Sequence, residues 1–200
     1  MRILAVADLH GSQYRLNIVL ENIKKYSPEI VIICGDITQF GPGEVATNFL
    51  NQIPVETFAI TGNIDTLDVY KAIDKSKAKN IDGKKIEKNG IEFIGVGGDH
   101  PSQQKISFIE KLVDEKSVVV SHVPPHGLQD KVFIGMHAGS KELREFVDKQ
   151  KPRLIICGHI HEDPGYTKTK NSVVVNCSMG KRGEGAIIEI NKTIDVKMLE

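Results

Sequence analysis

Short apolar runs that end beside a residue of a metal-binding type recur along this chain, and they constrain its fold more than any other feature. Runs of this kind predict strands that are buried on both faces, as in a parallel sheet covered by helices. Because the carboxyl ends of parallel strands meet at one edge, the residues after them should converge there. The runs occupy residues 3–7, 30–34, 58–61, 118–121 and 154–157, and the polar residues that follow include Asp8, Asp36, Asn63, His122 and His159.

The first part of the chain is expected to alternate strand and helix, which predicts a parallel sheet with right-handed crossovers. Ser12 is a suitable N-cap for the first helix, and Asp65 for the third. Pro28 should end the first helix. The expected elements are strands at 2–7, 30–34 and 55–60 and helices at 13–26, 44–51 and 65–76.

The later part of the chain favours antiparallel pairing as well. Asn89-Gly90 is a strong hairpin signal between strands at 84–87 and 91–96. Residues 122–139 form a long irregular segment, and Ser140 should cap a helix that ends near Lys149. The remaining expected elements are a helix at 105–115 and strands at 117–120, 153–157, 166–169, 173–176, 185–190 and 193–198. We expect an α/β protein with two mixed β-sheets flanked by helices, folded as one domain over residues 1–200.

Composition excludes several classes of partner. The net charge is zero, which argues against strong binding to long nucleic acids. No apolar run reaches the ~20 residues that span a bilayer, and the N-terminus lacks a signal-peptide layout. The three cysteines, Cys34, Cys157 and Cys177, each lie in or beside an apolar run and are expected to be buried and reduced. We therefore expect a cytoplasmic protein without a membrane partner.

Taken singly, the polar residues at the strand ends are weak signals. Asp8-x-His10 also fits a helix-entry turn, and His122 also fits an ordinary strand-end histidine. Gly158-His159-Ile160-His161 is the best single motif, although a solvated loop would suit it too. Four of the seven histidines lie beyond buried strands. In combination the set is too large for one transition metal with an open position, so it predicts two ions. Oxygen and nitrogen donors without sulfur suit manganese, iron, nickel, cobalt or zinc.

These motifs together resemble the calcineurin-like metallophosphoesterase superfamily, and most closely its small stand-alone prokaryotic phosphodiesterases. The resemblance spans nearly the whole chain and implies a four-layer αββα sandwich. It implies two divalent transition-metal ions, with manganese the first expectation. It assigns the first ion to Asp8, His10, Asp36 and His161, and the second to Asp36, Asn63, His122 and His159, with Asp36 as the bridge.

One position departs from the family pattern. Many members carry Gly-Asn-His in the third motif, where the histidine protonates the leaving group or stabilises the transition state. This chain has Gly62-Asn63-Ile64-Asp65, and Ile64 cannot transfer a proton. His126 and His137, in the segment that follows His122, are candidates to replace the lost acid or to bind phosphate, and His100 is a more distant candidate; each could equally be a solvated loop histidine.

The resemblance implies a phosphoesterase that most readily hydrolyses phosphodiesters, by in-line attack of a metal-generated hydroxide on phosphorus. Two divalent ions, two aspartates and one hydroxide leave a charge of about plus one, which suits a diester monoanion. The expected catalytic residues are Asp36, Asn63, His122 and His137. A phosphomonoesterase or nuclease with the same centre is an alternative, and so is a non-catalytic interaction scaffold. The expected partner is a small phosphorylated substrate, and an apolar hairpin or edge strand could support a homodimer.

The stretch Asn176-Cys177-Ser178-Met179-Gly180 resembles the Asn-Pro-Gly-Ser turn near the end of related small phosphoesterases. Asn176 or Ser178 could line the site, or the stretch could be a structural turn. Lys181 and Arg182 could attract phosphate or form a solvated basic turn.

Overall fold

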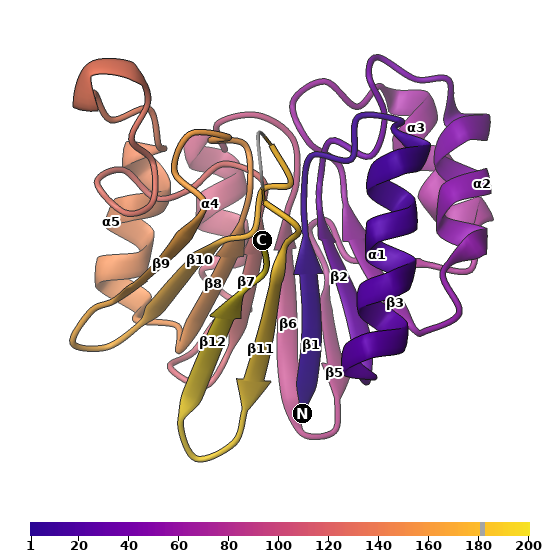
Figure 1. Cartoon of the computed structure of the whole chain (residues 1–200). Helices are drawn as coiled ribbons and strands as arrows, with labels where there is room; N and C mark the ends of the chain where they lie inside the picture. The colour runs from indigo at the N-terminus through magenta and orange to yellow at the C-terminus, as the bar shows by residue number, and fades with distance from the viewer. Residues whose placement is uncertain (181–182) are drawn as a thin grey trace.

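Two six-stranded β-sheets lie face to face in the computed structural model, which describes residues 1–180 and 183–200 (Figure 1). Lys181 and Arg182, for which a phosphate-attracting role or a basic turn was expected, lie outside these residues. The first sheet has the order β12-β11-β1-β2-β3-β4, with bounds Ile194–Met198, Ala186–Ile190, Arg2–Val6, Ile30–Cys34, Thr57–Ile60 and Lys79–Asn80. The second has the order β5-β6-β7-β8-β10-β9, with bounds Lys85–Lys88, Ile91–Val96, Val118–Ser121, Leu154–Cys157, Val173–Asn176 and Gly165–Lys168.

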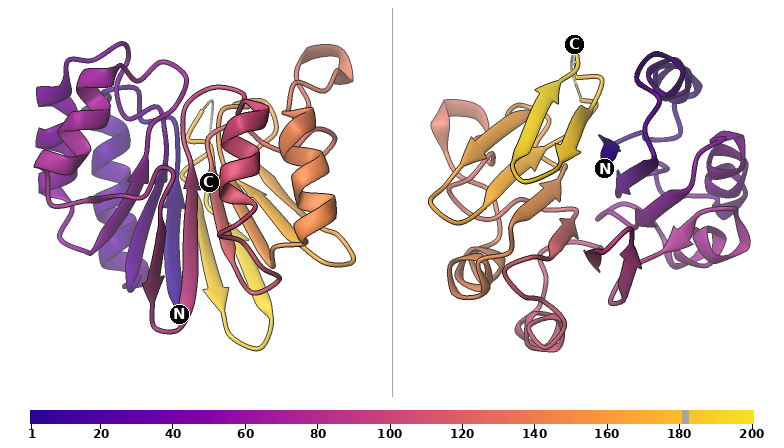
Figure 2. Two further views of the ribbon diagram at one scale, coloured as in Figure 1. Left: turned by 180° about the vertical axis from the view of Figure 1, so that it is seen from behind. Right: turned by 90° about the horizontal axis from the view of Figure 1, so that it is seen from below.

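Helices cover the outer face of each sheet, as the two views of Figure 2 show. The first sheet is covered by α1 (Gln13–Tyr26), α2 (Gly43–Gln52) and α3 (Leu67–Lys75). The second is covered by α4 (Gln103–Ile109) and α5 (Lys141–Gln150), and a 3₁₀ turn, η1 (Phe133–Gly135), precedes α5. The four-layer αββα sandwich of two mixed sheets is therefore confirmed.

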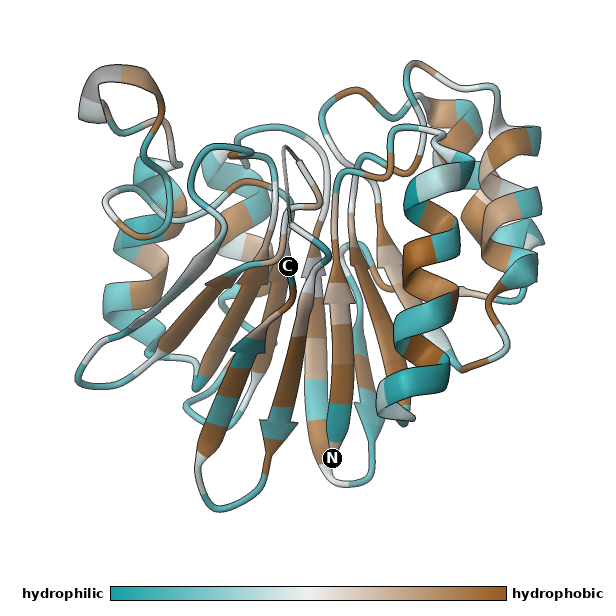
Figure 3. Cartoon of the chain, in the orientation of Figure 1, coloured by the Kyte–Doolittle hydropathy of each residue, from teal (hydrophilic) through white to brown (hydrophobic). Residues whose placement is uncertain are grey.

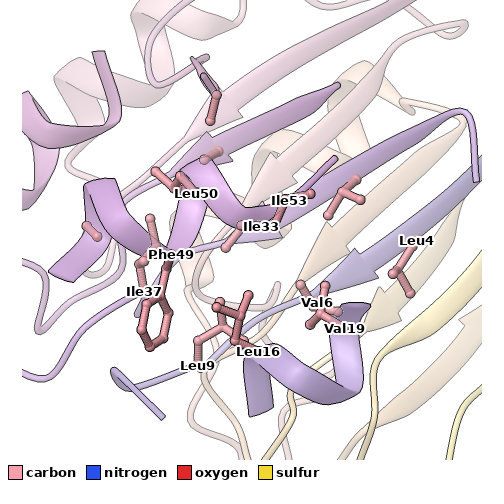
Figure 4. Packing of buried hydrophobic residues seen from close by; sticks show 14 of the residues in the cluster. Leu4, Val6, Leu9, Leu16, Val19, Ile33, Ile37, Phe49, Leu50 and Ile53 are labelled. Atoms are coloured by element: carbon pink, nitrogen blue, oxygen red, sulfur yellow. The ribbon is translucent and has the colours of Figure 1, made fainter. Parts of the chain in front are cut away.

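Burial on both faces explains why the central strands are continuously apolar (Figure 3). In β1, Leu4 and Val6 pack toward α1, whereas Ile3 and Ala5 lie between the two sheets. This alternation follows from the period of two along a strand. Figure 4 shows the outer layer, where Leu16 of α1 packs among residues of the first sheet and its helices.

Parallel pairing in both sheets puts the ends of the central strands at one edge of the sandwich. β1, β2 and β3 pair in parallel, and so do β6, β7, β8 and β10 in that order. An isolated bridge between Ala7 and Ser178 connects the two sheets at that edge. The segments that leave the strands there carry the residues singled out in the sequence.

The structure corrects some of the expected local elements. Asp65 is not the cap of α3, because the helix begins at Leu67 and Thr66 occupies the N-cap position. α4 covers Gln103–Ile109 rather than 105–115, because the Ser102 hydroxyl accepts from the N–H of Lys105 and starts the helix earlier. The two-residue strand β4 is too short for its sequence to predict. The Asn89-Gly90 hairpin between β5 and β6 is confirmed.

Candidate metal centre

Four of the predicted ligands adopt a left-handed backbone conformation, which residues other than glycine rarely do. The φ angles are 64° at Asp8, 50° at His10, 51° at Asp36 and 68° at His159. Asp8 and Asp36 follow β1 and β2 closely, so the chain bends sharply as it leaves the sheet. Backbone strain of this kind clusters at functional sites, where the surrounding structure has to maintain it.

The first group of predicted ligands contains Asp8, His10 and His161. Their ligand atoms lie within 4.8 Å of one another. His10 Nε2 lies 3.3 Å from His161 Nε2, and His161 Nε2 lies 3.5 Å from Asp8 Oδ1. Asp8 is fully buried and the two imidazoles are partly exposed, so the group opens toward solvent on its histidine side.

The second group contains Asp36, Asn63, His122 and His159. His122 Nε2 lies 2.8 Å from Asn63 Oδ1 and 3.5 Å from Asp36 Oδ2. His159 Nδ1 lies 3.1 Å from the same Asn63 oxygen. His122 is fully buried, whereas Asn63 is exposed. The structure thus brings together all the residues that the sequence associates with the second ion.

Asp8 connects the two groups. It belongs to a second set of close ligand atoms, with Asp36 and His122, and its Oδ2 accepts the backbone N–H of His159 at 3.1 Å. Asp36 is the residue that the family pattern expects to bridge the two ions. Its Oδ1 atom accepts the backbone N–H of Ile64 at 3.2 Å.

Two glycines allow the carboxylates to lie where they do. A Cβ atom on Gly62 would stand 2.0 Å from Asp36 Oδ1. A Cβ atom on Gly158 would stand 2.3 Å from the Ala7 Cβ and 3.0 Å from Asp8 Oδ2. Both positions exclude any side chain, because real Cβ atoms do not approach other heavy atoms so closely. The glycines before Asn63 and His159 therefore have a packing role in addition to a turn role.

The polar atoms of the two groups fit bound cations. The N–H at His122 Nδ1 donates to the carbonyl of Cys34 at 2.8 Å, so Nε2 is left as an acceptor in the neutral ring. That acceptor faces Asn63 Oδ1, another acceptor. Asp8 Oδ1 and His10 Nδ1 are buried and have no hydrogen-bond partner within the described residues. A donor set of carboxylate, amide and imidazole without thiolate suits divalent transition metals.

The two aspartates experience opposite electrostatic environments. Burial would raise the pKa of Asp8, but the His161 ring beside its carboxylate and the charge of His122 lower it to about 2. Burial raises the pKa of Asp36 to about 6, and the nearby His122 offsets only part of that effect. Asp36 is thus the carboxylate that most needs a positive charge beside it at neutral pH.

The histidines of the two groups also have pKa values shifted in different directions. Burial lowers the pKa of His159 to about 4, and His122 adds to the effect. Burial also lowers the pKa of His10, whereas the Asp8 carboxylate beside the His161 ring raises the pKa of His161. Neutral imidazoles at His10 and His159 are in the form that binds metals.

Arg15 and Asp65 support the centre in ways that the motifs do not indicate. Arg15, in the first turn of α1, donates from Nη1 to the carbonyl of Asp8 at 2.5 Å and from Nη2 to that of Gly180 at 3.5 Å. The Asp65 carboxylate accepts the backbone N–H groups of Ile37, Thr38 and Gly62, so it holds the second motif against the third. The only sequence signal for either is proximity to a motif.

The segment after His122 holds a carboxylate–histidine pair. His137 Nδ1 lies 2.5 Å from Oδ1 of Asp130, a fully buried residue, and the other oxygen of Asp130 accepts the N–H groups of Gly127 and Gly139. Burial would raise the pKa of Asp130, but these hydrogen bonds hold it below its usual value. The His126 ring lies 5.5 Å from that of His137, centroid to centroid.

Within the described residues, His100 and Asn176 form hydrogen bonds to neighbouring segments of the chain and not to the predicted metal ligands. His100 is exposed, and its backbone N–H donates to Asp99 Oδ1. Asn176 is fully buried, and its amide donates to the carbonyls of Gln129, Ile160 and Asp163. Asn176 therefore forms a structural turn that ties the His159–His161 segment to the loop after His122.

Known proteins with related sequences and folds place these features in context. The family model described as calcineurin-like phosphoesterase matches residues 1–163. The uncharacterized protein MJ1162 of Methanocaldococcus jannaschii is 31% identical over 89% of this chain and 88% of its own length. A probable glycerophosphodiester phosphodiesterase, GpdQ, of Arcobacter nitrofigilis is 25% identical over 77% of this chain and 64% of its own length. A dimetal phosphatase from Danio rerio has the same fold, with a TM-score of 0.70, 12% identity, and coverage of 99% of this chain and 95% of that one.

Proposed function

The chain belongs to the calcineurin-like phosphoesterase family, and from that premise we propose that it is a dinuclear metal-dependent phosphodiesterase acting through a single domain. The family is one of metal-dependent hydrolases, and the chain's Asp and His groups could hold metal ions. The proposal adds the number of ions, the residues that hold them and the class of ester.

The convergence of the two ligand groups carries this proposal. Asp8, His10 and His161 would hold one ion, and Asn63, His122 and His159 the other, with Asp36 between them. In the first group the Nε2 atoms of His10 and His161 lie 3.3 Å apart, and in the second the acceptor atoms His122 Nε2 and Asn63 Oδ1 face each other at 2.8 Å. Manganese is the ion that we propose first, because a mixed set of oxygen and nitrogen donors without sulfur suits it.

The protein's own residues prepare the site for hydrolysis. The hydrogen bond from His122 to the Cys34 carbonyl fixes the ring orientation, and the one from His159 N–H fixes Asp8. Arg15 holds the carbonyl of Asp8 and keeps a positive charge near His10 and His161. Bound divalent ions would supply positive charge for the phosphoryl oxygens and make hydroxide available at neutral pH.

We propose phosphodiesters as the substrate class because two observations agree. The residual charge of the proposed centre, about plus one, suits a monoanion. The relative from Arcobacter nitrofigilis bears the name of a diesterase. A good leaving group needs no acid, whereas for a poor one we propose His137 in its imidazolium form, which the Asp130 carboxylate orients and stabilises through Nδ1 while Nε2 donates the proton.

The test compares the hydrolysis of bis-p-nitrophenyl phosphate and p-nitrophenyl phosphate with manganese present. We expect the diester to be preferred, and Asp36→Asn and His122→Ala to lower kcat/KM by at least about 100-fold. Asp195→Asn, an exposed carboxylate change away from the site, should be neutral. Full activity of both site variants would exclude the proposed centre.

A non-catalytic scaffold is the alternative that Ile64 favours, because the family's acid is lost there. The two readings differ in metal content. An enzyme should bind close to two ions per chain, measured by elemental analysis, and both site variants should bind fewer. A scaffold should bind none tightly and should leave every ester in the panel intact.

A further inference from the structure

A small hairpin of residues 131–137 projects from the segment between His122 and α5 (Figure 1). Its tip has the sequence Val132-Phe133-Ile134-Gly135-Met136, without a polar side chain. Phe133 is 66% exposed and Met136 is 60% exposed. Displaying two large apolar side chains in this way lowers solubility, so it calls for a reason.

The apolar hairpin is built firmly at its base. Lys131 and His137 form an antiparallel bridge, the N–H of Val132 donates to the carbonyl of Met136 at 2.8 Å, and that of Ala138 donates to Asp130. Below the bridge, the buried Asp130 carboxylate holds His137. The N–H of Lys131 also donates to Asp163 Oδ2, close in sequence to His161. The tip therefore keeps a fixed place relative to the candidate metal centre.

Other exposed apolar side chains share this edge of the molecule. Each lies shortly after a predicted ligand, on a segment that leaves the carboxyl end of a strand of the first sheet. They are Tyr14 after His10, Phe40 after Asp36 and Leu67 after Asn63. In the hydropathy view, loops at this edge carry apolar colour on both sides of the sandwich (Figure 3). The edge that carries the phosphoesterase site thus also carries an apolar rim.

The exposed charges on the apolar hairpin itself and at the first residue of α5 are positive, and the nearby carboxylates of Asp163 and Glu142 accept hydrogen bonds from the N–H of Lys131 and from Ser140 Oγ. Between Val123 and Lys141 the only acidic residue is Asp130, which is buried and paired with His137. Lys131, at the base of the hairpin, and Lys141, at the start of α5, are exposed. An apolar tip flanked by exposed lysines complements an anionic lipid surface, where the side chains enter the interface and the ammonium groups meet the headgroups.

We propose that the apolar hairpin docks the protein on anionic lipid surfaces, so that the metal centre faces lipid headgroups and the substrates are phosphate esters of amphiphiles. The docking stands by itself, and the substrate class rests on the proposed function. Within the described residues no helix could cross a membrane. Docking by a loop tip requires none, and it departs from the sequence-based expectation of no membrane partner, which rested on the lack of a spanning run and of a signal-peptide layout.

Sedimentation with vesicles tests the docking without any catalysis. The purified chain is mixed with vesicles of phosphatidylcholine alone or with added phosphatidylglycerol. We expect binding to the anionic vesicles, a loss of at least tenfold in Phe133→Ser/Met136→Ser, and a weaker preference for anionic lipid in Lys131→Gln. Phe108→Ser is the matched control, because Phe108 is 53% exposed on α4 outside this segment, and it should bind like the wild type.

Three results would overturn the docking: no binding by the wild type, equal binding by the double variant, or a dimer in light scattering that the double variant abolishes. The last would make the hairpin a contact between two copies of the chain. Hydrolysis of bis-p-nitrophenyl phosphate separates this proposal from the proposed function. The double variant should keep the wild-type rate on that soluble diester while losing activity on phosphatidylglycerol in vesicles.

Discussion

His159 donates its backbone N–H to Asp8 Oδ2 at 3.1 Å, across the two sheets of the sandwich. Asp8 follows β1 in the first sheet and His159 follows β8 in the second, 151 residues later. Because Asp8 also lies beside His161 and within the Asp36–His122 group, this hydrogen bond sets the spacing between the two halves of the candidate centre. Changes at Asp8 should therefore act on stability and on metal binding together.

Asp8→Asn should destabilise the protein even in a chelator. The folded-state pKa of Asp8, about 2, lies below its ordinary value. The carboxylate therefore contributes stability that is present above pH ~4 and lost as the pH falls through about 2. Its loss should lower the free energy of unfolding at pH 7 by about 2 kcal/mol. Denaturant unfolding with EDTA measures this change.

Asp8→Ala serves as the companion variant. It leaves the N–H of His159 without its acceptor, which should cost about 1–3 kcal/mol more than the asparagine change. Equal stability of the two variants would mean that the cross-sheet hydrogen bond contributes nothing.

Asp36→Asn should have the opposite effect and stabilise the metal-free protein. The pKa of Asp36, about 6, lies above its ordinary value, so the folded state binds the proton more tightly than the unfolded state does. The stability of the wild type should then fall as the pH rises from about 4 through about 6. Removing the carboxylate should raise the free energy of unfolding at pH 8 by up to about 3 kcal/mol.

Unfolding curves in EDTA at pH 4.5, 6 and 8 would follow this difference, which should shrink toward acidic pH. With manganese the order should reverse, because the wild type would gain stability from metal binding and the variant would not. Asp195→Asn provides the control, since its carboxylate is exposed. A variant less stable than the wild type at pH 8 in EDTA would contradict the raised pKa.

The recurring strand ends were sufficient to predict the parallel pairing and the residues that meet at the edge of the sheets, whereas the four layers were implied by the resemblance to the family. That prediction works because parallel pairing brings strand ends together whatever the loops do. Contacts through space are different: nothing local to Asp65 indicates that it accepts from Ile37, Thr38 and Gly62 rather than capping α3. The placement of the hairpin tip also escapes prediction, since it depends on the buried carboxylate of Asp130.

Gly62→Ala should disrupt the candidate metal centre by displacing the Asp36 carboxylate. The new Cβ would lie 2.0 Å from Asp36 Oδ1, so the carboxylate has to move out of the second ligand group. We expect a loss of about 3 kcal/mol in stability and of most manganese binding. Gly90→Ala, with a φ of 74° and no atom within 4 Å of its Cβ, should cost only about 1 kcal/mol and keep its metal. Thermal melting of each variant with and without manganese makes the comparison. An equal rise in Tm on adding manganese in the two variants would argue against a second ion beside Asp36.

Ile64→His should restore the acid that the family pattern places at this position. The backbone N–H of Ile64 donates to Asp36 Oδ1 at 3.2 Å, so residue 64 already lies at the edge of the centre. General acid catalysis contributes about 100-fold or more when a poor leaving group departs, and little when the leaving group is already stable as an anion. The variant should therefore hydrolyse methyl phenyl phosphate at least about tenfold faster than the wild type while matching it on bis-p-nitrophenyl phosphate.

Ile64→Gln, which is polar but transfers no proton, is the control and should not hydrolyse methyl phenyl phosphate faster than the wild type. An equal gain on both esters would indicate better substrate binding instead of proton donation, and no gain on either would mean that His137 or solvent already supplies the proton.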